Sequence, residues 1–201
     1  MGIAIDTLMN IPTRKNNPFV QKAKENGKPV VGYMCGYVPD EILYAGGILP
    51  YRLEADGITS TELGEAYVYK FFCTFSTSLL HGALTGEFDF LDGVVFLNGC
   101  DQLRRVIGIW KEKVNGPMHQ YIGMLAVPHR FSEQGFKWYL DEITRMKEEV
   151  KGYFGIRIDE DDLRNAIKVY NETRRLIEKL YKLRKADQPK LFTISNFFSR
   201  P

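Results

Sequence analysis

The sequence predicts an α/β fold in which a doubly wound, mostly parallel sheet is flanked by helices and followed by a C-terminal helical extension. Two observations predict this fold class. Short runs of β-branched and aromatic residues alternate with longer segments in which apolar residues recur at helical spacing, and such alternation is typical of parallel sheets built from β-α-β units. Towards its end the chain shows helical periodicity without a further strand pattern.

The first part of the chain contains two strand patterns and two helix patterns. Residues 28–34 form a short β-branched and aromatic run bounded by glycines, which indicates a buried strand. A helix is expected from Pro39, because proline favours the first helical position, and a glycine pair at 46–47 should end it. We then expect a strand over 48–53 and, after a polar loop, a helix over 62–84.

The second part repeats the alternation and ends in two long helices. We expect strands over 90–97 and 119–127, separated by a helix that begins at Asp101. Helices are then expected over 133–153 and 159–183. The apolar side chains at helical spacing are Leu103, Val106, Ile107 and Trp110 in the first of these helices, Phe136, Leu140, Ile143 and Met146 in the second, and Leu163, Ile167, Tyr170, Ile177 and Leu180 in the third.

The length of the chain bears on its division into domains. At roughly 150 residues per domain, 201 residues correspond to one domain or one and a fraction. We expect an α/β domain over residues 1–153 and a helical extension over 154–201, with the boundary between the last two helices.

Charge and composition exclude several classes of partner. Lys and Arg number 27 and Asp and Glu 25, so the net charge of +2 provides no electrostatic footprint for nucleic acid or an anionic membrane. No signal-peptide pattern precedes Pro18, and the longest stretch without a charged residue is shorter than a membrane span. We therefore expect a soluble, cytoplasmic protein that binds neither nucleic acid nor membrane.

Familiar nucleotide and hydrolase motifs are missing from the sequence. No two of the 18 glycines are separated by a single residue, which excludes the dinucleotide-binding fingerprint. A Walker phosphate loop, a His-Glu-x-x-His helix, a Gly-x-Ser-x-Gly elbow and a Cys-x-x-Cys pair are also missing. We expect that the chain does not itself hydrolyse ATP.

The three cysteines are the best candidates for a chemical role. A small odd number does not suit a disulfide scaffold and fits a reducing compartment. Cys35 follows the first predicted strand and Cys100 the third, each before a predicted helix, and ligands of open α/β sheets bind beyond the carboxyl ends of the strands. If Cys73 packs over the same edge, three thiolates converge, and such soft ligands select iron-sulfur clusters, zinc or copper(I).

A different interpretation is that these thiols only fill space. Free cysteine is among the most buried residue types and often behaves as a small hydrophobe. The three cysteines are also far apart in the sequence. Spacing alone leaves both interpretations open.

The residues around the cysteines resemble those of a known family. The run VVGYMCGYVPDEIL that contains Cys35, with the following AGGILP, resembles the first cysteine motif of the 2-hydroxyacyl-CoA dehydratase and benzoyl-CoA reductase family. Similar segments follow in order: Cys73 after an aromatic run, FDFLDGVV at 88–95, Cys100-Asp101 with Arg104 or Arg105 and Trp110, Val127-Pro128-His129, and DL…YNETR at 162–174. The resemblance covers nearly the whole chain and implies the N-terminal half of a longer subunit, with the C-terminal half absent.

The resemblance implies an iron-sulfur enzyme. In that family three cysteines hold a [4Fe-4S] cluster with one iron left open, and at matching positions these would be Cys35, Cys73 and Cys100. A separate ATP-hydrolysing activator supplies a low-potential electron that turns an acyl-CoA thioester into a ketyl radical anion, after which a 2-hydroxyl leaves as water or an aromatic ring is reduced. The family also implies a heterodimer with a paralogous subunit. The resemblance identifies no catalytic acid or base.

Two other functions stay open at this point. One is a non-catalytic assembly or electron-relay paralogue of the same family, since not every paralogue carries the active cluster. The other is a structural zinc site formed by the same thiols. Elemental analysis of anaerobically prepared protein separates these possibilities.

Further residues near the predicted strand ends each have two interpretations. His129 follows a strand end, where it presents a proton donor to the site or else lies exposed or caps a helix. Asp101 with Arg104 or Arg105 either supports the cluster sulfurs or forms a surface salt bridge.

Some neighbours of the cysteines are expected to have structural roles. Asp40 and Glu41 are explained as first-turn acids that favour the helix dipole. Phe71, Phe72 and Phe75, beside Cys73, are expected to form core, where they would also shield a cluster from water.

Overall fold

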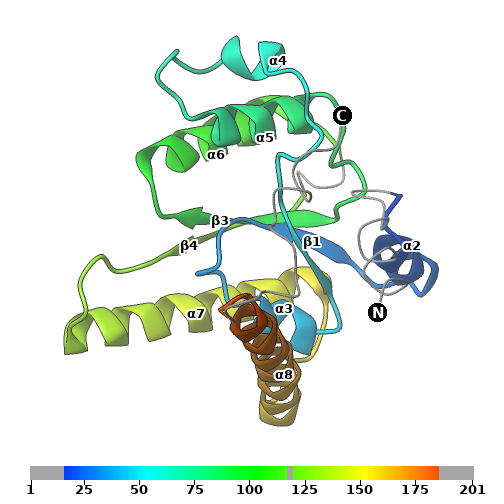
Figure 1. Ribbon diagram of the computed structural model, residues 1–201, viewed down its shortest axis with the longest axis vertical. Coiled ribbons are helices and arrows are strands. Elements are labelled where there is room, and N and C mark those ends of the chain that lie inside the picture. Colours follow the sequence, from blue (N-terminus) through cyan, green and yellow to red (C-terminus); the bar gives the residue numbers. More distant parts are fainter. Residues whose placement is uncertain (1–15, 117–119, 186–201) are drawn as a thin grey trace.

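The computed structural model describes residues 16–116 and 120–185, and its centre is a sheet of parallel strands with helices on both faces (Figure 1). The strand order is β2-β1-β3-β4, and all three neighbouring pairs are parallel. The strands are β1 (Val30–Tyr33), β2 (Leu49–Arg52), β3 (Gly93–Asn98) and β4 (Ile122–Ala126). The helices are α2 (Pro18–Glu25), α3 (Asp40–Ala45), α4 (Glu62–Glu65), α5 (Thr74–Leu84), α6 (Asp101–Lys113), α7 (Glu133–Phe154) and α8 (Glu160–Arg184).

Two hydrophobic cores lie on the two faces of the sheet. Successive side chains of a strand point to opposite faces, so Val30 and Val31 contribute to different cores, as do Phe96 and Leu97. The first core is closed by α2, α5 and α6, and the second by α3 and α7. Figure 1 shows α5 and α6 over one face and α3, α7 and α8 over the other.

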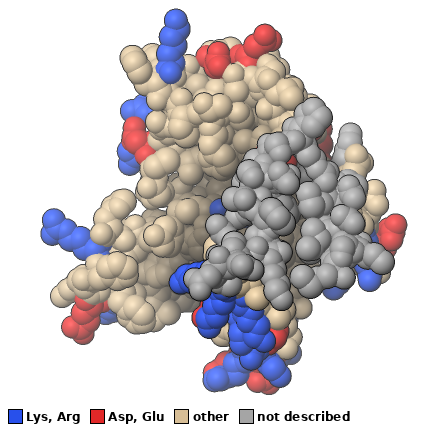
Figure 2. Space-filling model, in the orientation of Figure 1, with Lys and Arg blue, Asp and Glu red and all other residues tan. Residues whose placement is uncertain are grey.

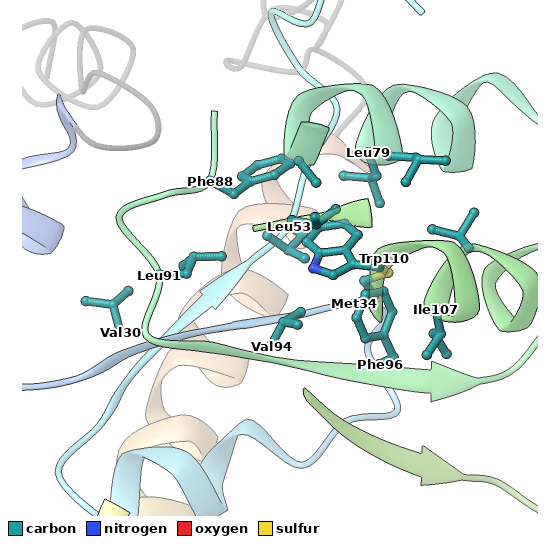
Figure 3. Close-up of a cluster of buried hydrophobic side chains, with 14 of the residues drawn as sticks. Val30, Met34, Leu53, Leu79, Phe88, Leu91, Val94, Phe96, Ile107 and Trp110 are labelled. Atoms are coloured by element: carbon teal, nitrogen blue, oxygen red, sulfur yellow. The ribbon is translucent and has the colours of Figure 1, made fainter. Parts of the chain in front are cut away.

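Trp110 is the largest fully buried side chain and anchors α6 to the sheet. Its ring stacks near Phe88, with centroids 6.3 Å apart, and meets the edge of Phe96 on β3 at 5.1 Å. Figure 3 shows these rings among the aliphatic side chains of the first core. Because α6 is fixed at this point, the position of its N-terminus above the carboxyl end of β3 is fixed as well.

The predicted fold class is confirmed, and the strands lie within or close to the predicted ranges. The third strand begins at Gly93, so the prediction that residues 90–92 are part of it was wrong. Asp92 instead lies in a bend just before the strand. Its carboxylate accepts the backbone N–H of Val30 at 2.7 Å and pairs with Lys24 at 2.7 Å. The expected strand residue His119 lies outside the described residues.

The prediction of one helix over residues 62–84 was wrong. The chain forms the short α4, leaves helical geometry and begins α5 after Cys73, whose extended backbone marks the N-cap. The short helix folds back onto α5, where Gly64 lies against the backbone of Thr77: a Cβ on Gly64 would lie 2.4 Å from the carbonyl oxygen of Thr77. Because both sides of the break are helical, periodicity alone does not reveal this reversal.

The structure also contains a helix that the sequence did not predict. Asn17 caps α2 by accepting the N–H of Phe19 at 2.9 Å, and Pro18 occupies its first turn. This Asn-Pro pair is the signal that was missed. By contrast, Pro39 is the N-cap residue of α3 rather than its first helical residue, and Gly46 ends that helix as expected.

The predicted core faces of the last two helices were only partly correct. In α7 the buried side chains are Met146 and Val150, whereas Phe136 and Leu140 are exposed. In α8 the residues that pack against the rest of the protein include Leu163 and Ala166, and the expected core residues Ile167, Ile177 and Leu180 are exposed. Each helix extends beyond the surface that it covers, so periodicity overestimates the buried length.

None of the described helices has the length and apolar character needed to cross a membrane. The longest, α8, begins with a capping box in which Asp159 and Asp162 bond to each other's backbone N–H groups at 3.0 Å. Much of the remaining surface of α8 consists of charged side chains paired along the helix, such as Arg164 with Glu160.

We expect Gly64→Ala to destabilise the protein by about 1–3 kcal/mol, because overpacking against a backbone carbonyl cannot be relieved by a side-chain rotation. Gly108→Ala in α6 is the matched control: nothing lies within 4 Å of the added Cβ, and alanine stabilises a helix interior by up to about 1 kcal/mol over glycine. Urea unfolding measures both. Equal effects of the two substitutions would contradict the close approach of α4 to α5.

Candidate functional site

The site lies where the connections of the sheet diverge. From β1 the chain crosses to β2 on one side, whereas the neighbouring strand β3 leads to β4 on the other side. In open α/β sheets, ligands bind beyond the carboxyl ends of the strands at such a switch point. Cys35 follows the end of β1 and Cys100 follows the end of β3, so two of the three thiols lie at this place.

Cys100 is the N-cap residue of α6. Its backbone is extended, with φ −149° and ψ 157°, and its Sγ accepts the backbone N–H of Leu103 at 3.4 Å. The side chain is exposed. The sulfur therefore lies at the positive end of a helix of 13 residues, where a negatively charged ligand atom is favoured.

Cys73 is the N-cap residue of α5 and is tied to the Cys100 loop through Gln102. The backbone N–H of Cys73 donates to Oε1 of Gln102 at 2.6 Å. Its thiol donates to Oγ of Ser76 at 3.2 Å, and the Ser76 hydroxyl in turn donates to the Cys73 carbonyl at 3.0 Å. The N-termini of α5 and α6 are thus held side by side, each with an exposed thiol.

Cys35 has an unusual backbone conformation. Its φ of 71° lies in the left-handed region, and it is the one non-glycine residue with positive φ in the described part of the chain. Glycine adopts this conformation freely, whereas it costs another residue about 1–2 kcal/mol. The side chain is half-buried against the core of α3 and α7. A side chain kept at a strained position beside a strand end suggests a role for its thiol.

The structure brings the three cysteines to one edge of the sheet without assembling them into a finished site. Within residues 16–116 and 120–185, no group of three or more His, Cys, Asp or Glu side chains is arranged to hold a metal ion. Cys73 and Cys100 lie at the α5 and α6 termini, and Cys35 packs toward the opposite face. A group that used all three would have to sit over the strand ends.

Asp101 forms surface ion pairs. Its carboxylate pairs with Arg104 and, at 3.3 Å, with Nε of Arg105, and all three side chains are exposed. Hydrogen bonds from these two guanidinium groups hold the pKa of Asp101 below its usual range. The surface salt-bridge interpretation is therefore confirmed for these residues, and Asp40 and Glu41 are the first-turn acids expected in α3.

The aromatic residues beside Cys73 were predicted to be core, and this was wrong for two of them. Phe71 is 92% exposed and Phe75 is 43% exposed, whereas Phe72 packs against the first core. The segment between α4 and α5 runs over the surface, because the reversal at Gly64 carries it there. The Phe71 ring therefore lies at the surface and does not shield the Cys73 thiol as core would.

A cavity of about 560 Å³ lies next to the cysteine loops and was not expected from the sequence. It is formed by the loops after β1, β3 and β4 together with the first turns of α7, and His129 belongs to its exposed rim. The available signal was the pair of aromatic residues Phe131 and Phe136 shortly after the fourth strand.

A hydrogen-bonded cluster connects the start of α3 with α8. The hydroxyl of Tyr33 donates to Asp40 at 2.9 Å, and Glu41 pairs with Arg174, whose guanidinium lies over the ring of Tyr170 at 5.8 Å. Burial raises the pKa of the Asp40 carboxyl and the charge of Glu41 raises it further, while the hydrogen bond from Tyr33 lowers it. This cluster secures α8 beside the Cys35 loop.

Fold and site together define a doubly wound α/β protein that carries thiols at its switch point. Over residues 35–200 the sequence matches the family described as 2-hydroxyglutaryl-CoA dehydratase, D-component. The chain belongs to this family, and the resemblance seen in its cysteine motifs is confirmed.

Several relatives are enzyme subunits. The chain is 33% identical to a benzoyl-CoA reductase subunit of Thauera aromatica over 166 residues, which are 81% of this chain and 42% of the relative. It is 30% identical over 157 residues to the beta subunit of (R)-2-hydroxyglutaryl-CoA dehydratase of Acidaminococcus fermentans (78% and 41%), and 28% identical over 161 residues to the (R)-phenyllactyl-CoA dehydratase beta subunit of Clostridium sporogenes (79% and 42%). The chain spans about two fifths of the length of these relatives.

We expect Asp40→Asn to stabilise the protein at neutral pH by up to about 1 kcal/mol, a small value because water screens the half-exposed carboxyl. The folded-state pKa lies above the unfolded one, so ionising Asp40 costs the folded state. This cost is absent below the unfolded pKa, grows as the pH rises between the two values and is constant above both. The amide still accepts the hydrogen bond from Tyr33.

Denaturant unfolding of wild type and Asp40→Asn at about pH 3.5 and pH 7 measures this difference. Asp141→Asn, an exposed carboxylate on α7, is the control and should change stability by less than about 0.5 kcal/mol at either pH. A stability difference between wild type and Asp40→Asn that is the same at both pH values would contradict a raised pKa of Asp40 in the folded protein.

Proposed function

We propose that this chain forms the cluster-binding part of an iron-sulfur subunit that acts on acyl-CoA thioesters, either by removing a 2-hydroxyl as water or by reducing an aromatic acyl group. The observation that carries the proposal is that Cys35 and Cys100 lie at the switch point and that Cys73 is tied to the Cys100 loop through Gln102, with Cys73 and Cys100 at helix N-termini. The relatives are named as dehydratase and reductase subunits for CoA thioesters, which supports the substrate class.

The donor set fits an iron-sulfur cluster in its chemistry. Thiolates are the ligands that such clusters take, and both Cys73 and Cys100 are exposed, so that each is accessible to iron. Cys35, Cys73 and Cys100 would hold the cluster, with a fourth iron position open. When bound, the cluster supplies low-potential one-electron chemistry.

The residues around the thiols have definite tasks in this proposal. The N–H of Leu103 donates to the Cys100 sulfur, and hydrogen bonds to the sulfurs tune the potential of such a cluster. Ser76 Oγ accepts from the Cys73 thiol and so keeps a polar neighbour at that sulfur. Gln102 holds the two loops at a fixed separation through its bond to Cys73.

The proposal includes two protein partners. Relatives are named as subunits, which supports a paralogous partner and hence a heterodimer. A separate ATP-hydrolysing activator would supply the electron, and the lack of nucleotide-binding motifs in this sequence supports that division of labour. Reduced thiols and anaerobic electron transfer suit a cytoplasmic enzyme.

Anaerobic reconstitution with iron and sulfide tests the cluster directly. We expect brown protein with about four irons and four sulfides per chain. Colourless protein without bound iron after reconstitution would contradict the proposal, and bound zinc without sulfide would favour a structural zinc site. A cluster that is never linked to thioester turnover, after addition of partner subunit, activator and ATP, would identify a non-catalytic electron-relay or assembly protein.

Serine substitutions identify the ligands. We expect Cys35→Ser, Cys73→Ser and Cys100→Ser each to lose most of the iron, because an alkoxide is a poor replacement for a soft thiolate. Thr74→Ala, beside Cys73 and without a thiol, is the control and should keep it. Iron retained by Cys35→Ser but lost from the other two would show that Cys35 is not a ligand and that another chain or segment completes the set.

Gln102 is a positioning residue in this arrangement. We expect Gln102→Leu to weaken iron retention about tenfold, as loss of a supporting hydrogen bond does at other metal sites, because the Cys73 amide loses its acceptor. Gln134→Leu on α7 is the matched control. Release of iron to a chelator, followed by absorbance under anaerobic conditions, measures both, and equal release rates would exclude a role for Gln102.

A further inference from the structure

The cavity beside the cysteine loops has the size and position of a ligand pocket. Its volume of about 560 Å³ is within the range of roughly 300–1,000 Å³ that is usual for small-molecule sites. Tyr37, in the loop that begins with Cys35, and Gly99, the neighbour of Cys100, both line it. The pocket therefore opens onto the same edge of the sheet as the thiols.

The walls of the pocket are mostly aromatic and aliphatic. Its floor includes Leu97 at the end of β3 and Val127 and Pro128 after β4. Four aromatic side chains surround it, namely Tyr37, Phe131, Phe136 and Tyr139. The basic side chains of the lining, His129 and Arg130, are exposed at its rim. These two are the basic residues among the described residues that line the pocket, and both face solvent, whereas the other lining residues are uncharged.

The aromatic residues at the mouth are exposed to an unusual degree. Phe131 is fully exposed, Phe136 is 72% exposed and Tyr37 is 64% exposed. Contiguous exposed apolar patches on a soluble protein commonly mark a binding site. Figure 2 shows the molecule from the side seen in Figure 1. The left part of the surface in that view is hollowed and mainly uncharged, with Lys, Arg, Asp and Glu side chains around its margin.

Hydrogen bonds between side chains and the backbone tie the walls of the pocket together. The hydroxyl of Tyr139 donates to the carbonyl of Tyr37 at 2.9 Å and so joins α7 to the loop after β1. Ser132 caps α7 by accepting the N–H of Gly135 at 3.0 Å. A Cβ on Gly135 would lie 2.7 Å from the carbonyl of Arg130, so glycine allows the loop to approach the helix. The walls are therefore preformed, which lowers the entropy cost of binding.

We propose that this pocket receives the acyl group of the thioester and selects uncharged aromatic or aliphatic acyl groups over those that end in a carboxylate. The inference rests on the proposed action on acyl-CoA thioesters. A carboxylate that enters the pocket loses water, which is costly, and the basic residues of the lining that it could pair with, His129 and Arg130, are exposed, where an ion pair contributes little. An uncharged acyl group instead meets the apolar and aromatic surface that includes Leu97, Phe136 and Tyr139. An acyl group held here directs its thioester end toward the pocket mouth beside Cys35 and Cys100.

A short thioester tests the pocket without the cluster and without the rest of CoA. The probes are S-benzoyl-N-acetylcysteamine and its succinyl counterpart, titrated into the full chain without iron and followed by methyl NMR. We expect saturable shifts at Leu97 and Val127, which line the pocket, but not at Leu163, which belongs to α8 and packs against the second core. The benzoyl thioester should bind at least about tenfold more tightly than the succinyl one.

Substitutions of aromatic residues locate the site. We expect Phe136→Ala and Tyr37→Ala each to weaken benzoyl binding about three- to tenfold, the usual contribution of an aromatic contact. Trp138→Ala is the control: it removes another exposed aromatic side chain of α7 that does not line the pocket, and it should leave binding unchanged. Circular dichroism checks that all three variants are folded as in wild type.

The possible results separate this inference from the proposed function. Saturable benzoyl binding that Phe136→Ala does not weaken, shifts confined to other residues, or equal binding of the succinyl thioester would each overturn the pocket assignment, while a reconstituted cluster would leave the proposed function standing. Pocket binding in a chain that takes up no iron would support the acyl site and contradict the cluster. Absence of binding by either probe at millimolar concentration would overturn the inference.

Discussion

The parallel pairing of β1 with β3 is the constraint on which the rest of the structure depends. These two strands are joined in register from Val31 opposite Gly93 to Tyr33 opposite Val95, yet the chain leaves them in opposite directions, toward β2 and β4. Helices that follow the two strands are drawn apart, so the space above their carboxyl ends stays open. Cys35, Cys100 and the aromatic pocket all border this space because of that single pairing.

Packing on the two faces then determines which side chains border the opening. Trp110 fixes α6 on one face, so that the Cys100 thiol lies at the helix N-terminus above β3. On the other face Tyr139 joins α7 to the Cys35 loop. The left-handed conformation of Cys35 is a local cost that the rest of the packed structure must offset. A well-packed core thus supports both a residue with a strained backbone, Cys35, and an open apolar pocket.

Local sequence was sufficient for the sheet because each strand is a short apolar run bounded by turn residues, and alternation with helices implies parallel pairing. It was insufficient wherever a helix boundary or the exposure of a side chain depended on contacts with residues far away in the sequence. The break between α4 and α5 follows from Gly64 against Thr77, a contact that periodicity cannot reveal. Cys35 and Cys100 were correctly expected after strand ends, but the tie of Cys73 to the Cys100 loop through Gln102 and the opposite orientation of Cys35 depend on tertiary geometry. The exposure of Phe136 likewise depends on where α7 leaves the sheet.

The arrangement has a consequence for how substrate and electrons would reach one site. The pocket opens on the α7 side of the strand ends, whereas Cys73, Cys100 and Phe71 lie at the exposed termini of α5 and α6. An acyl group in the pocket would therefore cover the site from one side and leave the thiol loops accessible from the other. If the proposed function holds, an activator protein would reach the thiol loops from the α5 and α6 side without displacing a thioester from the pocket. Because the connections after β1 and β3 diverge, the pocket and the thiol loops are accessible from different sides.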